Sequence, residues 1–284
     1  MDKEKYQLTK DMTEAIRFYM GDPKVCEAGL WRGGPEAYNT INALLHPGTG
    51  NEEDKAREGR VMEIYDGAHM ESYIRLILQV LAGMALYLEQ AGDQAPTLSY
   101  RIDRASSLNR FREDGGVISG FFSTCRWGFL PAYAHKKAGI VLLEVERERQ
   151  LPFLDFSTLF GDLYAKPEEA EILLPFGSVI EEMHPVPLTE EEKGLYTDFH
   201  GMAPEGKWHL RLGPGIYPEV PEDHLKALRA GLTDESMVRR VSGCLQVLTS
   251  GRPLDQESKA FYCAYKEKLM TCICGEAAKI FRQK

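Results

Sequence analysis

The sequence predicts an α+β protein in which a sheet core is preceded and followed by helices. Apolar residues recur at helical spacing over residues 1–94 and again after residue 221. Between them, short aromatic and β-branched runs are bounded by Gly, Pro and Asp. These runs do not alternate regularly with helices, which favours α+β over a parallel doubly wound sheet. We therefore predict an N-terminal helical segment (1–94), a sheet core (95–184), and a Pro/Gly-rich linker with helices (185–284).

Two helices are predicted in the N-terminal segment. Thr9 is placed to cap a helix that runs to Met20, because its hydroxyl can accept a hydrogen bond from a first-turn amide. Apolar residues at three- and four-residue spacing predict a longer helix over 61–89. Residues 46–59, rich in Gly, Asn and acidic side chains, are typical of a solvated loop.

The sheet core contains five runs with the composition of strands. The run 138–145 is almost continuously apolar, as expected for a strand of a sheet domain. The predicted strands cover residues 97–102, 120–124, 138–145, 170–174 and 177–183.

The C-terminal third begins with a stretch dense in Pro and Gly between residues 184 and 221. We expect this stretch to be irregular, because Pro and Gly disfavour both helices and strands. Three amphipathic helices are then predicted, around Leu225–Leu228, Met237–Leu248 and Phe261–Ile280.

Composition limits the function classes that remain. With 34 basic and 43 acidic residues the net charge is −9, which argues against a protein that holds nucleic acid mainly by neutralising phosphates. A local basic pocket for one small anion is still compatible with this balance. Six cysteines are too few and too unpatterned for a disulfide scaffold, so we expect reduced thiols and a cytosolic environment.

No targeting or membrane segment is predicted. The N-terminal residues are mixed in charge and lead into an amphipathic stretch, unlike a Sec-type signal peptide. The most apolar stretch, 74–88, is interrupted by Arg75 and Gln79 and falls short of the roughly 20 residues that span a bilayer. We expect a cytoplasmic protein, or one delivered into a target cell by another route, without a membrane partner.

Common nucleotide and metal signatures are missing. The chain has no Gly-x-Gly-x-x-Gly, no Gly-x-x-x-x-Gly-Lys, no His-Glu-x-x-His and no paired Cys-x-x-Cys motif. Cys272 and Cys274 fall within a predicted amphipathic helix, where packing explains them better than ligation. The seven histidines are scattered, so we expect no metal site.

Three short pieces of the sheet core carry side chains suited to chemistry. Arg101 stands in the first strand, where its planar fork suits phosphate oxygens. Ser123 and Thr124 follow two phenylalanines in the second strand and offer short hydroxyl hydrogen bonds. Glu169 and Glu171 precede an apolar strand, and in an extended segment carboxylates two residues apart share one face. Taken singly, each also fits an ordinary surface or strand residue.

In this order the three pieces resemble the Arg, Ser-Thr-Ser and Glu-x-Glu motifs of mono-ADP-ribosyltransferases. The similarity is greatest to the arginine-specific class, which includes cholera-like toxins, clostridial actin-modifying toxins and vertebrate ectoenzymes. It covers residues 95–183, about a third of the chain. The resemblance implies a mixed two-sheet core and an NAD-dependent transfer of ADP-ribose to a protein arginine, in a bacterial toxin or effector.

The resemblance also implies a role for each residue. NAD is the co-substrate, and its nicotinamide–ribose bond breaks through an oxocarbenium-like transition state. Glu171 would be the catalytic glutamate, which hydrogen-bonds the nicotinamide ribose and stabilises this cation. Ser123 would orient it, with Thr124 supporting the strand, and both would belong with Glu171 to the residues that bind NAD. Arg101 would bind an NAD phosphate. Glu169 would steer the acceptor arginine to the anomeric carbon.

Two positions depart from the family pattern. Cys125 stands where the last Ser of Ser-Thr-Ser is expected, and a thiol is a weaker hydrogen-bonding group. Trp31-Arg32-Gly33 also resembles the family's aromatic-Arg-Gly pattern, so Arg32 is an alternative to Arg101. Within the loop 153–166, expected to shape acceptor recognition, Tyr164 is a candidate acceptor-facing aromatic residue.

Two other functions are compatible with the same residues. An NAD glycohydrolase would use water in place of the protein acceptor. A non-catalytic NAD-binding or protein-interaction module would retain the fold without turnover, and Cys125 keeps this alternative open. Against it, Arg101, Ser123, Glu169 and Glu171 all have the side chains that catalysis requires.

Overall fold

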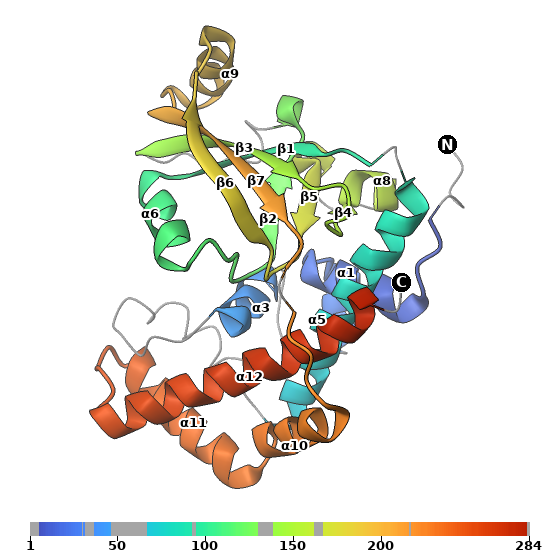
Figure 1. Ribbon diagram of the computed structural model, residues 1–284, viewed down its shortest axis with the longest axis vertical. Helices are drawn as coiled ribbons and strands as arrows, with labels where there is room; N and C mark the ends of the chain where they lie inside the picture. The colour runs from blue at the N-terminus through green and yellow to red at the C-terminus, as the bar shows by residue number, and fades with distance from the viewer. Residues whose placement is uncertain are drawn as a thin grey trace. The chain divides into compact units, whose positions relative to one another are not determined.

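The computed structural model describes residues 6–29, 31, 37–46, 67–92, 95–129, 139–161, 167–215 and 217–282. Over these residues it contains ten α-helices and one mixed seven-stranded sheet, which confirms the α+β class (Figure 1). The chain forms two compact units, and the division falls within one long helix. The first comprises Met1–Gln7 and Met84–Ile216, and the second comprises Leu8–Gly83 and Tyr217–Lys284.

The sheet lies in the first unit, with strand order β4-β5-β2-β1-β3-β7-β6. Neighbouring strands are antiparallel except β3 and β7, which are parallel. The five predicted strands are confirmed as β1, β2, β3, β5 and β6. The strands are β1 (Leu98–Arg104), β2 (Phe122–Cys125), β3 (Ile140–Arg147), β4 (Leu154–Asp155), β5 (Glu171–Leu174), β6 (Val179–Val186) and β7 (Gly206–Gly213).

The expectation of two sheets is wrong, because the strands form a single sheet. One group of strands, β4-β5-β2, meets the other, β1-β3-β7-β6, where Tyr100 of β1 pairs with Cys125 of β2. By contrast, β1 pairs with β3 over seven positions, from Leu98 to Arg104. The two groups are therefore joined by a shorter ladder than the four pairs of β2 with β5 or the seven pairs of β1 with β3.

The stretch 184–221, expected to be irregular, contains a helix and a strand. Helix α9 (Glu190–His200) begins with a capping box, in which the Thr189 hydroxyl and the Glu192 carboxylate each accept a backbone N–H. Strand β7 follows and alternates polar with apolar residues. Its parallel pairing with β3 extends the sheet beyond the predicted core.

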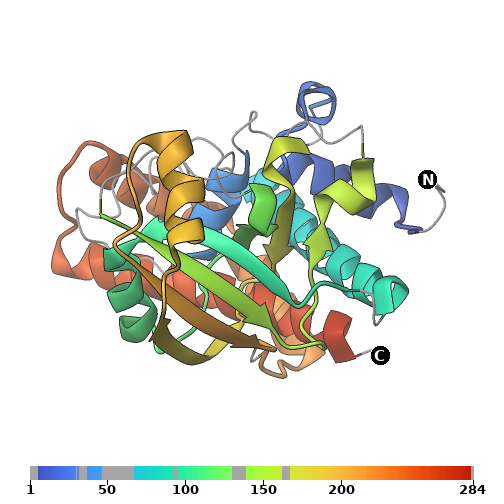
Figure 2. The same ribbon diagram turned by 90° about the horizontal axis from the view of Figure 1, so that it is seen from above.

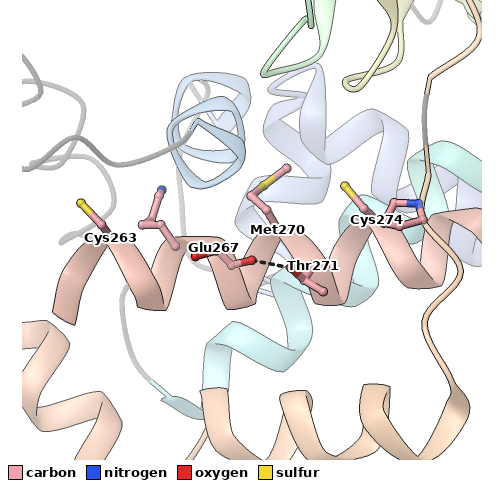
Figure 3. A pocket seen from close by; sticks show the side chains of 7 residues that line it. Cys263, Glu267, Met270, Thr271 and Cys274 are labelled. Atoms are coloured by element: carbon pink, nitrogen blue, oxygen red, sulfur yellow. Dashed lines mark hydrogen bonds between the residues drawn. The ribbon is translucent and has the colours of Figure 1, made fainter. Parts of the chain in front are cut away.

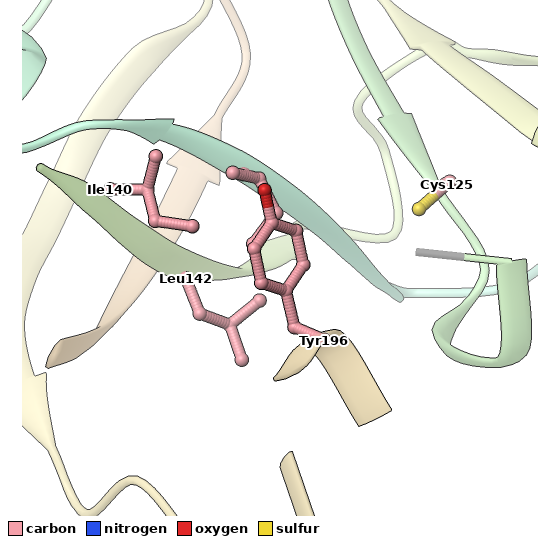
Figure 4. Packing of buried hydrophobic residues seen from close by; sticks show 5 residues of the cluster. Cys125, Ile140, Leu142 and Tyr196 are labelled. Atoms are coloured by element: carbon pink, nitrogen blue, oxygen red, sulfur yellow. The ribbon is translucent and has the colours of Figure 1, made fainter. Parts of the chain in front are cut away.

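Helix α9 covers one face of the sheet beside β3 (Figure 2). Tyr196 of α9 is fully buried in a cluster with Ile102, Ile140 and Leu142, which lie on β1 and β3 (Figure 4). Cys125 of β2 belongs to the same cluster. This apolar cluster therefore reaches from α9 to the strand that carries Ser123.

Arg147, the last residue of β3, is buried and holds the chain segment that leads to β4. Its guanidinium donates to the carbonyls of Pro96 (2.7 Å) and Leu151 (3.1 Å) and lies 4.0 Å from the centre of the Phe153 ring. Burial lowers the pKa of Arg147 to about 10. Two further helices, α6 (Ala105–Glu113) and α8 (Phe156–Phe160), follow β1 and β4.

Helices make up the second unit. Thr9 caps α1 as predicted, by accepting the Met12 N–H. Lys266 of α12 is buried, and its ammonium donates to the carbonyls of Ala43 and Leu44 at the end of α3, both at 3.0 Å. The three predicted C-terminal helices are confirmed as α10, α11 and α12. The helices of this unit are α1 (Lys10–Tyr19), α2 (Pro23–Glu27), α3 (Ala37–Leu45), the first part of α5 (Gly67–Ala91), α10 (Glu222–Leu232), α11 (Glu235–Thr249) and α12 (Gln256–Arg282).

Helix α5 confirms the described part of the helix predicted over 61–89, since residues 61–66 lie outside the described residues. Its segment Met70–Ala91 is long and apolar enough to cross a membrane by length and composition alone. In this structure 56% of its most apolar window is buried inside the protein, as in the core helix of a globular fold. The loop predicted over 46–59 lies outside the described residues except for His46.

We predict that Arg147→Met lowers the free energy of unfolding by about 2 kcal/mol, because buried carbonyls lose their donor. Urea denaturation measures the change. Arg149→Met is the matched control, since Arg149 is exposed two residues away, and it should cost less than about 0.5 kcal/mol. Equal effects of the two substitutions would contradict a structural role for Arg147.

Candidate active site

Ser123 and Glu171 are brought together by the antiparallel pairing of β2 with β5. Cys125 pairs with Glu171 and Ser123 pairs with Leu173, so the side chains of Ser123 and Glu171 lie on the same face of the sheet. The Ser123 hydroxyl donates a hydrogen bond to Oε1 of Glu171. Both residues are half-buried. Glu171 is the first residue of β5, and the three apolar residues that follow it are buried. The contact orients a carboxylate that remains partly accessible.

Thr124 lies on the opposite face and has a structural contact. Its side chain is fully buried, and its hydroxyl donates to the carbonyl of Ile172 at 2.9 Å. This bond links β2 to β5 one residue away from the Ser123–Glu171 contact. It therefore helps to fix the register that places those two side chains.

Arg101 contacts the backbone of the strand that carries Ser123. Its Nη1 donates to the Ser123 carbonyl at 2.6 Å, and its Nε donates to Oδ2 of Asp103 at 2.9 Å. The guanidinium also lies 4.8 Å from the centre of the Phe122 ring. Strand alternation sets Arg101 on the face opposite Tyr100, so it meets Ser123 at the main chain rather than at the hydroxyl.

Asp103, which the sequence argument did not single out, completes the environment of Arg101. Its carboxylate also accepts the Ser107 hydroxyl at 2.7 Å and the Arg104 N–H at 2.8 Å. Burial by itself would raise the pKa of Asp103, but Arg101 and these hydrogen bonds outweigh it and lower the pKa below its usual value. The Arg-x-Asp spacing within one strand is the signal that could have revealed this pair.

Glu169 does not lie in an extended segment, so the argument that placed it on one face with Glu171 is wrong. It ends a 3₁₀ turn (Pro167–Glu169), and Ala170 then adopts a left-handed conformation with φ 41°. That conformation is uncommon for a residue with a side chain, and such strained positions cluster at functional sites. Glu169 is half-buried, whereas its neighbour Glu168 is exposed.

Cys125 is buried beside charged groups. Burial raises the pKa of its thiol, Arg101 opposes the rise, and Glu171 and Glu169 add to it. Since Cys125 is fully buried, it packs as a small apolar group in the cluster with Ile102, Ile140 and Tyr196.

A second arginine, also missed by the sequence argument, follows β2. Arg126 forms an ion pair with Asp155 at 2.5 Å and donates to the Thr158 hydroxyl at 3.2 Å. Asp155 is buried, caps α8 through the Thr158 N–H, and pairs with Ile172 of β5. This contact ties the end of β2 to the edge of the sheet next to Glu171. The Asp-x-x-Thr pattern of Asp155 and Thr158, which is typical of a helix N-cap, could have revealed Asp155 in the sequence.

A charged cluster lies on the same face, further along the sheet. Paired positions form one row across the strands: Glu171, Cys125, Tyr100, Glu144 and His209. Lys207 bonds Glu144 at 2.7 Å and Glu192 of α9 at 2.6 Å. Burial opposes these pairings, but they outweigh it, so they lower the pKa of Glu144 and raise that of Lys207. The charge of Glu144 is thus balanced by Lys207 and His209, whereas the Glu171 carboxylate accepts a hydrogen bond from the neutral Ser123 hydroxyl.

Two candidate residues from the sequence, Arg32 and Tyr164, lie outside the described residues. Within the described part of the chain, no group of three or more His, Cys, Asp or Glu side chains could hold a metal ion. A pocket of about 340 Å³ runs along α12 in the second unit, lined by residues that include Cys263, Met270 and Cys274 (Figure 3). None of the predicted site residues lines that pocket.

Comparisons with models of known protein families, with curated proteins and with solved structures found no match to this chain. The functional argument therefore rests on the arrangement of Arg101, Ser123, Glu169 and Glu171.

We predict that Arg101→Gln removes a pH-dependent part of the stability. A carboxyl group whose pKa is lowered by folding stabilises the fold above its unfolded pKa, near 3.9, and loses this effect as pH falls. At pH 7 the variant should be about 2 kcal/mol less stable than wild type, and the difference should shrink as pH falls below about 4.

Urea denaturation at pH 7 and pH 3.5 measures this difference. Arg104→Gln is the matched control, because Arg104 contacts Asp103 through its backbone N–H, which the substitution keeps. A stability difference for Arg101→Gln that is the same at both pH values would show that the Asp103 pairing does not supply it.

Proposed function

We propose that this protein is an NAD-dependent mono-ADP-ribosyltransferase that modifies an arginine of a target protein, as a bacterial toxin or effector would. The observation that carries the proposal is the hydrogen bond from Ser123 to Glu171 across β2 and β5. It presents a half-buried carboxylate at the start of β5, and Glu169 ends the 3₁₀ turn just before that strand. The order of Arg101, Ser123 and Glu171 on three adjacent strands gives further support.

The chemistry requires an anion fixed beside a developing cation. The bond between the ribose anomeric carbon and the nicotinamide nitrogen breaks, its electron pair leaves with nicotinamide, and positive charge develops on the ribose. The Glu171 carboxylate stabilises that charge, and the Ser123 hydroxyl keeps the carboxylate oriented before the reaction begins. Such preorganised electrostatic stabilisation acts mainly on the transition state.

Arg101 supports the site from the neighbouring strand, with its side chain on the face opposite Glu171. Its contact with the Ser123 carbonyl holds the β2 main chain. The proposal that its charge also meets an NAD phosphate rests on the resemblance of the sequence motif. Tyr100 and Trp127, whose ring centres are 5.0 Å apart, add an aromatic pair beside Cys125 on the Glu171 face. A flat aromatic ligand group could pack against such a pair.

Glu169 is the residue that we propose to direct the acceptor. Glu169 ends the 3₁₀ turn that leads into β5, two residues before Glu171 in the chain, so a guanidinium paired with it would approach this end of the strand. The arginine nitrogen then forms a bond to the anomeric carbon and loses a proton. None of the six cysteines, which all lie in the described residues, forms a disulfide, and we propose that the protein acts in a reducing cytosol.

We predict that Glu171→Gln lowers the rate of nicotinamide release from NAD at least about a thousandfold, with little change in KM, because only transition-state stabilisation is removed. Chromatographic measurement of nicotinamide tests this. Glu168→Gln is the matched control, since Glu168 is an exposed carboxylate in the adjacent turn, and it should retain wild-type turnover. Wild-type turnover by the Glu171→Gln variant would rule out the assigned role.

We predict that Glu169→Ala abolishes arginine modification while a measurable rate of NAD hydrolysis remains, because Glu169 contacts the acceptor and not the ribose. Glu168→Ala serves as the control and should keep both activities. Agmatine, which carries a free guanidinium, is a suitable small acceptor for the comparison. Equal loss of transfer and hydrolysis in the Glu169→Ala variant would argue against an acceptor role.

The same assays separate the alternative functions. Nicotinamide release that depends on Glu171 but never labels an acceptor would indicate an NAD glycohydrolase. NAD binding without nicotinamide release by the wild-type protein would indicate a non-catalytic module. Each result would replace the proposed transferase.

A further inference from the structure

A pocket in the second unit gathers three arginines in a chain whose net charge is −9. Its volume is about 530 Å³, within the usual range for small-molecule sites. Arg239 and Arg240 come from α11, and Arg252 comes from the connection to α12. Among the lining residues the only carboxylate is Asp255.

An aromatic ring orients Arg240, and the acidic partners of Arg239 and Arg240 are exposed enough for a bound anion to replace them. Arg240 lies 4.0 Å from the centre of the Phe261 ring, which fixes the plane of its guanidinium without using its N–H groups. Its acidic partner Glu257, at 2.8 Å, is 87% exposed. The partner of Arg239, Glu235, is 85% exposed at 3.9 Å. Such exposed pairs add little stability, so an anion can displace them.

Asp255 keeps its negative charge, but its carboxylate is held at the start of α12. It accepts the Ser258 N–H at 2.8 Å and the Ser258 hydroxyl at 3.0 Å. These hydrogen bonds lower the pKa of Asp255. The floor of the pocket is uncharged, with Val247, Leu254 and the thiol of Cys244, whose pKa is raised by burial.

We propose that this pocket binds the phosphomonoester group of a small ligand. A dianionic phosphate offers several acceptor oxygens to planar guanidinium forks, and arginines pair with it bidentately. The apolar floor would take the organic part that carries the phosphate. The group belongs either to a free metabolite or to a lipid headgroup. The site is independent of the NAD chemistry proposed for Glu171.

The test uses the full-length protein and two probes. Phenyl phosphate, titrated by calorimetry at constant ionic strength, represents a free phosphomonoester with an apolar group. Vesicles containing phosphatidic acid, compared with vesicles containing phosphatidylserine, represent the lipid source. Arg240→Gln and Arg252→Gln are the test variants. Lys226→Gln is the control, because it removes one exposed positive charge from α10 outside the pocket.

We expect saturable binding of at least one probe that weakens about tenfold or more in each arginine variant and is unchanged in Lys226→Gln. Binding of phenyl phosphate identifies a free ligand, and binding of phosphatidic acid vesicles alone identifies a headgroup. No saturable binding of either probe would overturn the proposal. Equal weakening in all three variants would also overturn it, since it would reveal a general charge effect.

Discussion

The candidate site depends on the register between β2 and β5, in which Cys125 stands opposite Glu171. A slip of one residue would move the Glu171 carboxylate to the other face, away from the Ser123 hydroxyl. Three contacts oppose such a slip. Thr124 bonds the Ile172 carbonyl, Arg101 bonds the Ser123 carbonyl, and Arg126 pairs with Asp155 on the strand beside β5. Most polar side chains around the candidate site thus hold backbone in place, and the proposed chemistry rests on the half-buried pair Ser123 and Glu171.

Much of the fold could be predicted because its main signals are local. The apolar run of β3, the aromatic β2 and the Thr9 cap each act within a few residues. Strand β7 and helix α9 were missed because nearby Pro and Gly outweighed the alternation from Lys207 to Leu212 and the capping box at Thr189. The single sheet was not predictable, since the Tyr100–Cys125 pairing that joins its two groups of strands is a tertiary contact.

The candidate site residues come from the sequence, but their geometry could not be predicted from it. Spacing alone suggested that Glu169 and Glu171 share an extended segment, whereas a 3₁₀ turn and the left-handed Ala170 separate them. Arg101 was expected to face a ligand, and the structure shows it holding Asp103 and the β2 main chain. Local patterns identify residue types. Strand pairing and backbone strain decide what each side chain contacts, and those depend on the whole unit.

The most direct test of the proposed activity is a search for the modified side chain itself. Wild-type protein and the Glu171→Gln variant are incubated with NAD and a cell lysate, and ADP-ribosylated peptides are identified by mass spectrometry. The account predicts ADP-ribose on arginine side chains with the wild-type protein and none above background with the variant. Modification that is equally abundant with both proteins, or none with either, would contradict a transferase centred on Ser123 and Glu171.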